Sequence, residues 1–146
     1  MAKISARQAL VLHGIEAIHE RRETGELRFR LRAADGNAYI RTEAMTSGWQ
    51  NSHFHKRTFE TYIVERGWMA LAVANNDLTG PPTVSILEPQ QLVTTPVGLI
   101  HNVYLPAGAT IHTVKHGGTD GDADWHGAPA FDEIVRQMEV PQPAVP

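Results

Sequence analysis

Short apolar segments, separated by glycine and proline at regular intervals, limit the fold of this chain more than any other feature. Leu27, Phe29 and Leu31 alternate with arginines, which is typical of a strand that buries one face. Comparable segments, rich in Thr, Tyr, Ile and Val, follow at 38–46, 58–66, 68–74, 83–88, 92–95, 100–105 and 109–116. Many short strands joined by turns predict an all-β barrel or sandwich.

The two ends of the chain are expected to be helical. Ser5 and Gln8 have the spacing of a capping box, and Gly14 fits the end of a short helix, with a strand at ALVL (9–12) as the alternative. Near the C-terminus, apolar side chains recur with helical periodicity at Phe131, Ile134, Val135 and Met138. We therefore predict one domain, 1–146, with a barrel core at about 27–116, a polar loop at 117–127, a helix at about 129–139 and an extended tail at 140–146.

Composition excludes several classes of protein. There is no cysteine, so disulfides, thiolate metal ligands and cysteine nucleophiles are excluded. The formal net charge of −3 gives no broad cationic surface, and we expect neither nucleic acid nor a membrane as a partner. No apolar run is long enough to span a bilayer, and the first residues lack the pattern of a secretory signal peptide. These features predict a cytoplasmic protein.

One segment in the middle of the chain carries three side chains that are good metal ligands. His53 and His55 are one residue apart, so on a strand both imidazoles point to the same face. Glu60 lies an odd number of positions beyond His55, which would place it on the opposite face of an uninterrupted strand. We therefore expect the chain to turn at 56–58 and to return antiparallel beside the first strand, with Glu60 and Tyr62 facing inward.

A second segment, PVGLIHNVYL at 96–105, has a Pro-x-Gly turn that leads into a strand carrying His101. This strand could bring a third imidazole to the same ion. Three imidazoles and one carboxylate suit Fe(II), Mn(II), Ni(II), Co(II) or Zn(II), whereas magnesium and calcium prefer oxygen ligands. Four protein ligands leave an octahedral ion two open positions, which a substrate can fill.

These residues resemble the two sequence motifs of the cupin superfamily. The first motif, G-x5-H-x-H-x(3,4)-E-x6-G, corresponds here to Gly48, His53, His55, Glu60 and Gly67. The gap after its first glycine is one residue shorter in this chain.

The second cupin motif, G-x5-P-x-G-x2-H-x3-N, corresponds to Pro96, Gly98 and His101. Gln90 replaces its first glycine and Leu105 its final asparagine, two positions that mainly serve turns and backbone. The resemblance covers roughly residues 27–116 when the strand pattern is included.

The resemblance implies a small double-stranded β-helix barrel, often dimeric, with a metal site inside its mouth. It also implies the ligand set, which is His53, His55, Glu60 and His101. We therefore expect a divalent transition metal and a homodimer. Ile63 should face outward, under the C-terminal helix or a second subunit.

Three further residues are candidates for proton transfer. Tyr62 should share the inward face of Glu60, and Tyr104 flanks the His101 segment. The alternative for both tyrosines is an ordinary place in the aromatic core. His112 is expected to point inward and Lys115 toward water, and the alternative for His112 is a hydrogen-bonded structural role.

Two polar features have a structural and a functional interpretation. Arg28, Arg30 and Arg32 form a basic stripe that we expect to face solvent, with a grip on a phosphate or carboxylate substrate as the alternative. In the polar loop, Asp120, Asp122 and Asp124 imitate a calcium loop but lack its later ligands, which favours a solvated loop. The adjacent Trp125 and His126 are expected to dock the helix, and the alternative is a lid over the barrel mouth.

Three functions remain open from the sequence. The first is a metal-dependent enzyme that acts on a small oxygen-chelating substrate by dioxygenase, isomerase or lyase/cyclase chemistry. The second is a sugar-nucleotide isomerase or epimerase without metal, because HFHK loosely resembles the H-x-H-K run of some such cupins. The third is a non-enzymatic module that binds a small molecule or a metal.

Overall fold

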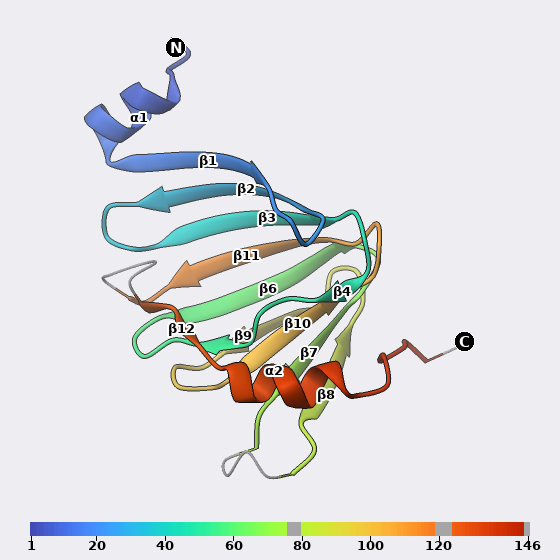
Figure 1. Ribbon diagram of the computed structural model, residues 1–146. Helices are drawn as coiled ribbons and strands as arrows, with labels where there is room; N and C mark the ends of the chain where they lie inside the picture. The colour runs from blue at the N-terminus through green and yellow to red at the C-terminus, as the bar shows by residue number, and fades with distance from the viewer. Residues whose placement is uncertain (76–79, 119–123, 145–146) are drawn as a thin grey trace.

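Two antiparallel sheets face each other and enclose the interior of the molecule (Figure 1). The computed structural model of the chain describes residues 1–75, 80–118 and 124–144. In order, the first sheet holds β1 (Ile15–Arg21), β2 (Glu26–Ala33), β3 (Ala38–Ala44), β11 (Thr110–His116), β6 (Phe59–Arg66) and β9 (Leu92–Thr95).

The second sheet is built from shorter strands. In order, it holds β12 (His126–Gly127), β5 (His53–Phe54), β10 (His101–Leu105), β7 (Met69–Val73) and β8 (Thr83–Leu87), and β4 (Gly48–Trp49) also pairs with β10. Strands distant in sequence, such as β3, β11 and β6, therefore lie side by side. This arrangement confirms the predicted all-β, double-stranded β-helix fold with a short C-terminal helix.

The first sheet begins earlier in the chain than predicted. We expected the barrel core to start at about residue 27, but β1 pairs with β2 along its whole length, from Ile15 opposite Ala33 to Arg21 opposite Leu27. None of the β1 residues is fully buried, so the strand lacks the apolar face that reveals a core strand in sequence.

The apolar core lies between the two sheets. Val64 and Ile111 come from the first sheet, and Met69, Leu71 and Val103 come from the second; each is at most 4% exposed. Alternation along β6 places Glu60, Tyr62 and Val64 inside, as predicted, because one face of this part of the strand is buried.

A β-bulge in β11 reverses two of the predicted orientations. Thr110 and Ile111 are adjacent, yet both are buried, and the register with β6 shifts between them. Because the bulge adds one residue to the alternation, Thr113 and Lys115 face the interior and His112 faces outward. The expected inward His112 and solvent-facing Lys115 are therefore both wrong.

The arginine stripe of β2 also faces the opposite way from the prediction. Arg28 lies opposite Thr42 and Arg30 opposite Ile40, and both partners are buried on the inner face of β3. Phe29 consequently points outward and is 43% exposed. An apolar face usually marks the core side of a strand, but here the inner face lines a polar cavity.

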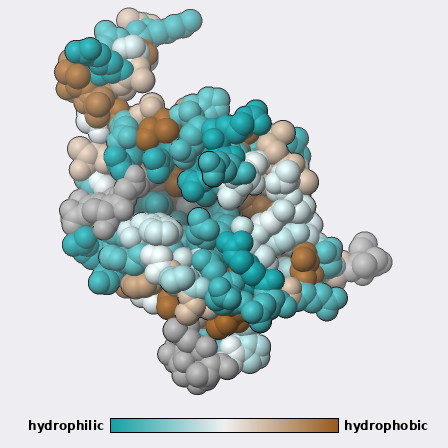
Figure 2. Space-filling model, in the orientation of Figure 1, coloured by the Kyte–Doolittle hydropathy of each residue, from teal (hydrophilic) through white to brown (hydrophobic). Residues whose placement is uncertain are grey.

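Helix α1 (Ala6–His13) begins and ends as the sequence predicts. The Ser5 hydroxyl accepts from the Gln8 backbone N–H at 3.1 Å, and the Gln8 side chain accepts from the Ser5 N–H at 2.9 Å. Gly14 closes the helix with φ of 66°. None of the residues of α1 is buried, and the helix projects from the edge of the first sheet with apolar side chains on its surface (Figures 1 and 2).

Helix α2 (Pro129–Arg136) covers the outer face of the second sheet (Figure 1). Phe131 and Val135 are buried and pack with Ala72 of β7. The sequence predicts that this helix ends at about residue 139, but it ends at Arg136. In the described parts of the chain, neither helix is long and apolar enough to cross a membrane.

The outer face of the first sheet keeps a small apolar patch. Ile63 and Leu92 are cross-strand neighbours on this face, and they are 37% and 62% exposed. Because α2 lies on the other sheet, the C-terminal helix does not cover Ile63, which corrects that expectation. A second subunit over this face, and hence a homodimer, stays a prediction that sedimentation analysis can check.

Gln90 stands where the second cupin motif has its first glycine. The backbone conformation at this position shows why the motif favours glycine there. Its φ is 72°, a left-handed conformation that costs a residue with a Cβ about 1–2 kcal/mol. We expect Gln90→Gly to raise the free energy of unfolding by about 0.5–1 kcal/mol in a urea titration. Gln90→Ala keeps the Cβ and should give no such gain; an equal gain would show that the side chain, not the backbone, is responsible.

Candidate metal centre

The four candidate ligands come from both sheets. His53 lies on β5 and is the cross-strand partner of His101 on β10, and His55 follows β5 directly. Glu60 lies on β6, which pairs with β11 and β9 in the facing sheet. The predicted hairpin between the His53 and Glu60 strands is therefore wrong. The chain instead crosses between sheets at 56–58, which turns Glu60 toward the histidines across the barrel.

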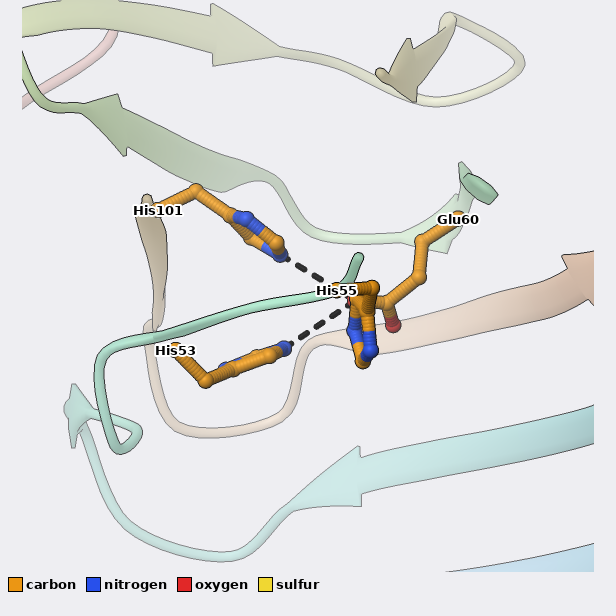
Figure 3. A group of neighbouring side chains, drawn as sticks. All are labelled: His53, His55, Glu60 and His101. Carbon is orange, nitrogen blue, oxygen red and sulfur yellow. Dashed lines mark hydrogen bonds and ion pairs between the residues drawn. The ribbon is translucent and has the colours of Figure 1, made fainter. Parts of the chain in front are cut away.

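The four side chains point toward one another in the interior (Figure 3). The Nε2 atoms of His53 and His101 lie 3.0 and 3.1 Å from Oε1 of Glu60, and Nε2 of His55 contacts the same oxygen. One ligand atom from each residue lies within 4.8 Å of all the others. All four residues are buried. The fold thus brings together the four residues that the motifs single out.

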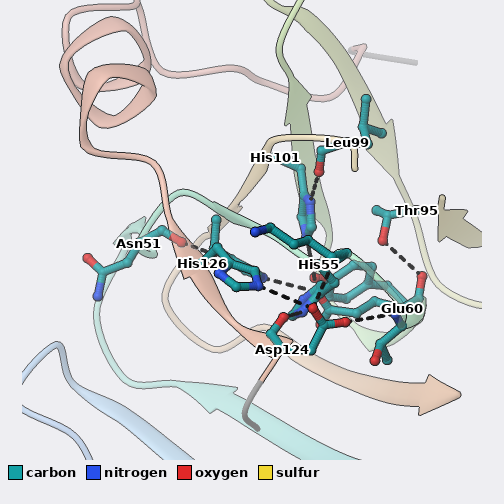
Figure 4. Close-up of polar contacts among 12 residues, drawn as sticks. Asn51, His55, Glu60, Thr95, Leu99, His101, Asp124 and His126 are labelled. Carbon is teal, nitrogen blue, oxygen red and sulfur yellow. Dashed lines mark hydrogen bonds and ion pairs between the residues drawn. The ribbon is translucent and has the colours of Figure 1, made fainter. Parts of the chain in front are cut away.

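Backbone carbonyls fix the protonation of each imidazole. Nδ1 of His53 lies 2.9 Å from the Asn51 oxygen, and Nδ1 of His101 lies 2.8 Å from the Leu99 oxygen. Nδ1 of His55 lies 2.7 Å from the backbone oxygen of Asp124 (Figure 4). A carbonyl oxygen only accepts, so each Nδ1 carries the proton and, in a neutral ring, Nε2 carries a lone pair.

The cluster therefore fits a bound cation. Three lone pairs directed at one carboxylate oxygen repel one another and the carboxylate, unless a positive charge lies among them. A divalent transition metal supplies that charge, and hydrogen bonds from Nδ1 to carbonyls are the usual support for imidazoles that bind metal through Nε2. Three imidazole nitrogens and one carboxylate oxygen match the donor preference of Fe, Mn, Ni, Co and Zn.

Electrostatics favour the metal-binding forms of two of these residues. Burial acts to raise the pKa of Glu60, but contacts with His101, His53 and His55 outweigh it and hold that pKa well below its usual range. Burial is also the main reason why the pKa of His53 is lowered. The carboxylate is thus held ionised, and His53 favours the neutral imidazole.

Asp124 organises the turn between the two sheets. Its carboxylate accepts hydrogen bonds from the backbone N–H groups of Lys56, Arg57 and Thr58 at 2.8, 2.7 and 2.9 Å. Burial acts to raise the pKa of Asp124, and these hydrogen bonds lower it far below its usual range. The same residue holds His55 through its backbone oxygen, so one residue fixes both the turn and a candidate ligand (Figure 4).

The expectation of a solvated aspartate is therefore wrong for Asp124, which is fully buried. Asp120 and Asp122 of the predicted loop lie outside the described residues. Nothing in the local sequence marks Asp124 as a cap, because its three partners lie more than 60 positions away in the chain.

The turn of the second motif is tied directly to the first motif. The Gly98 backbone N–H donates to the backbone oxygen of His55 at 2.6 Å. Thr95 of β9 donates its hydroxyl to the Glu60 backbone oxygen at 3.3 Å. These contacts hold the His101 segment against the strands that carry His55 and Glu60.

A cavity of about 370 Å³ opens beside the cluster, and His53, Glu60 and Tyr62 form part of its wall. Its other lining residues are Arg22, Thr24, Glu26, Arg28, Arg30, Ile40, Thr42, Gln50, Asn51, Ile111, Thr113, Lys115 and Trp125. The cavity therefore gives a small molecule access to the side of the cluster formed by His53 and Glu60.

Trp125 lines this cavity and does not dock the helix, which corrects our expectation. Its ring stacks on His53 with a centroid distance of 5.6 Å and an interplanar angle of 23°, while the residue is 46% exposed. His126 stacks instead on Phe54, at 5.1 Å. Trp125 therefore matches the alternative prediction, a position at the mouth of the barrel, rather than contact with the helix.

The position of Trp125 predicts a spectroscopic signal. Adding Co(II) to metal-free protein should quench the fluorescence of Trp125, because its ring stacks directly on a candidate ligand. In Trp125→Phe the remaining Trp49 and Trp68 should show much weaker quenching in the same titration. Undiminished quenching in this variant would place the bound ion elsewhere in the protein.

Tyr62 is the proton-transfer candidate that reaches the cluster. Its hydroxyl lies 3.2 Å from Nε2 of His101, and the residue is 3% exposed. Burial, and then the charge of Glu60, raise the pKa of Tyr62 well above its usual value. The phenol therefore keeps its proton and can donate a hydrogen bond inside the cavity.

Tyr104 and His112 do not reach the cluster. Tyr104 lies three residues from His101 on the same strand, so it faces the other side and packs against the rings of Trp49 and Trp68. His112 faces outward, where Nδ1 lies 2.6 Å from the Tyr39 hydroxyl and Nε2 lies 2.8 Å from a Glu65 oxygen. The structure therefore bears out the alternative given for each residue: Tyr104 belongs to an aromatic cluster, because of strand parity, and His112 is a hydrogen-bonded structural histidine, which the bulge turns outward.

Two facing antiparallel sheets that surround a cavity, with three imidazoles and a carboxylate at its wall, have the architecture of a cupin barrel. No protein-family model matches the sequence, and no curated protein matches it. Among solved structures, oxalate decarboxylase from Bacillus subtilis at pH 4.6 matches with a TM-score of 0.62, over 76% of this chain at 17% identity. A tryptophan-to-phenylalanine variant of that enzyme gives a TM-score of 0.63, over 77% of this chain at 17% identity.

Oxalate decarboxylase is a cupin, so this likeness confirms the fold that the sequence motifs predict: the chain folds as a cupin. The chain spans 30% of the length of the oxalate decarboxylase chains that it matches. Another matching structure of the same enzyme concerns its Mn(II) centres. At this level of identity the likeness concerns the fold, and the activity has to be argued from the site.

Proposed function

We propose that this protein is a metal-dependent enzyme for a small organic substrate that chelates the metal through oxygen. His53, His55, Glu60 and His101 would hold one divalent transition metal. The observation that carries this proposal is the convergence of three Nε2 atoms on one carboxylate oxygen, with each Nδ1 proton directed to a backbone carbonyl. When bound, the metal would act as a Lewis acid for an oxyanion or, if it is iron, as a redox centre.

The residues of the chain would bind the substrate and move protons around it. Tyr62 would donate a hydrogen bond to a developing oxyanion, because its protonated hydroxyl lies beside the cluster. Trp125 would restrict water at the mouth. Dioxygenase, isomerase and lyase/cyclase reactions all fit these roles. The Mn(II) centres of the matching enzyme support manganese as the first metal to try among Fe, Mn, Ni, Co and Zn.

The metal-free alternative accounts less well for the site. A sugar-nucleotide isomerase that works through histidine and tyrosine has no need of Glu60, yet Glu60 is the residue on which all three imidazoles converge. Stabilisation of metal-free protein by a dTDP-sugar, in a thermal-shift assay, would support that alternative.

The choice among reaction types follows from metal and oxygen dependence. Protein loaded with Fe(II), Mn(II), Zn(II) or Ni(II) would be tested with diketone, catechol-like and hydroxy-acid compounds. Oxygen uptake that requires Fe(II) would identify an oxygenase. Full turnover with Zn(II) or Ni(II), and without oxygen, would identify an isomerase or lyase. Metal binding with no turnover of any compound would contradict the enzymatic proposal and leave a binding module.

Tyr62→Phe tests the role of the phenol. We expect kcat to fall by about a hundredfold or more, with unchanged metal content, because the substitution removes one positioned proton donor. Tyr104→Phe is a matched control. It removes a tyrosine hydroxyl on the face of β10 that points away from the cluster, and it should leave kcat unchanged. Equal losses in the two variants would show that Tyr62 has only a structural role.

A further inference from the structure

Lys115 is a buried lysine in the wall of the cavity. It is 7% exposed and lies on the inner face of β11. Within residues 1–75, 80–118 and 124–144, its ammonium group makes no hydrogen bond or ion pair. Burial of a charge without a partner is costly, and lysine is among the residues that are almost never buried unpaired. A lysine in this position therefore requires an explanation.

The strand register places Lys115 beside the candidate metal centre. Lys115 is the cross-strand partner of Glu60, and Thr113 is the partner of Tyr62 in the next position. Cross-strand partners on one face have Cβ atoms about 4.5–5.5 Å apart. Glu60 does not neutralise Lys115, because its Oε1 is directed at the three histidines and no ion pair joins the two residues.

The remaining charged groups of the cavity do not supply a counter-ion either. Arg28 lines the same cavity and is itself a cation, so it cannot neutralise Lys115. Glu26 is the one other carboxylate that lines the cavity among the described residues, and it already pairs with Arg28 at 3.1 Å. Among the described residues, neither Glu60 nor Glu26 is therefore available as a counter-ion for Lys115, and a bound metal would add further positive charge nearby.

We propose that Lys115 binds a second acidic group of the substrate, whose chelating end occupies the metal. The substrate class is then a small acid with two anionic ends, such as a hydroxy or keto acid that carries a further carboxylate or phosphate. This inference rests on the proposed function, because it assigns the chelating end to the metal. The cavity of about 370 Å³ has room for a small molecule of this kind.

The test compares ligands that share one chelating end. Malate, glycerate 3-phosphate and 2-hydroxybutanoate all present an α-hydroxycarboxylate, and their other ends are a carboxylate, a phosphate and a methyl group. In calorimetric titrations of Mn(II)-loaded protein, malate or glycerate 3-phosphate should bind about 10-fold to 100-fold more tightly than 2-hydroxybutanoate. The tighter of the two would identify the acidic group that the site prefers.

Lys115→Met tests whether this residue is responsible. In the variant the three acids should bind with nearly equal affinity, while Mn(II) binding is retained. Without ligand or metal, the variant should melt about 3 °C higher than the wild type, because a buried cation without a counter-ion has been removed. Lys3→Met, at an exposed position, should change neither property.

Two results would overturn the inference, and they differ from a failure of the proposed function. Mn(II)-loaded wild type that binds the three acids equally, or binds none of them, would contradict the role of Lys115 and leave the metal site intact. Preserved discrimination in Lys115→Met would assign it to another residue. Wild type that binds no metal at all would contradict the proposed function itself.

Discussion

His101→Ala should lower the affinity of the protein for its metal by at least about 100-fold. A site with four protein ligands binds zinc with about 10–16 kcal/mol, so the loss of one ligand removes roughly 3 kcal/mol. The effect should be large in this chain, because His101 comes from a different motif than the other three residues and no other histidine of the described residues joins the cluster. Competition with a coloured chelator measures the affinity directly.

His112→Ala is the matched control for this variant. It removes an imidazole of the same type, but from the outer face of the barrel, where His112 contacts Tyr39 and Glu65. Metal affinity should therefore be unchanged. If His101→Ala kept full affinity, His101 would not be a ligand; if both variants lost affinity equally, the loss would reflect general damage to the fold.

Asp124→Ala should be the most destabilising single substitution that we predict outside the apolar core. It leaves three backbone N–H groups without their acceptor in a buried turn, which should cost about 3 kcal/mol and lower the Tm by roughly 10 °C. Metal affinity should fall as well, since the same turn positions His55. Urea unfolding and calorimetry measure the stability loss.

The pH dependence of this loss has a definite sign. The pKa of Asp124 is lowered in the folded protein, so its contribution is fully present above its unfolded pKa of about 4 and disappears as pH falls through the lower folded value. The stability difference between wild type and Asp124→Ala should therefore be constant near neutral pH and shrink in acid. Asp35→Ala, in an exposed turn, should cost much less; an equal cost would contradict the capping role of Asp124.

The candidate ligands could be found from the sequence because their signals are local. His53 and His55 are separated by one residue, and Pro96 and Gly98 precede His101 at a fixed distance. The relation of Glu60 to the histidines could not be found in the same way. Parity shows that one strand cannot hold all three residues, but it does not say whether the chain turns back in the same sheet or crosses to the facing one. The structure shows a crossing.

The orientation of β11 and β2 depends on partners that the sequence does not reveal. The bulge at Thr110 and Ile111 is a shift in the pairing with β6, which the sequence of β11 alone does not show. It turns His112 outward and Lys115 inward. On β2, the alternation correctly predicts a strand, but it wrongly places the apolar residues on the core side. A strand that lines a polar cavity reverses this rule, and its arginines face inward.

The central claim is that this barrel holds one transition-metal ion on three histidines and a glutamate. The most direct test is elemental analysis of the wild-type protein after incubation with Fe, Mn, Co, Ni and Zn in turn, followed by gel filtration to remove loosely bound ions. We expect one ion per chain to remain with at least one of these metals. Protein that emerges without stoichiometric metal after exposure to all of them would contradict the claim.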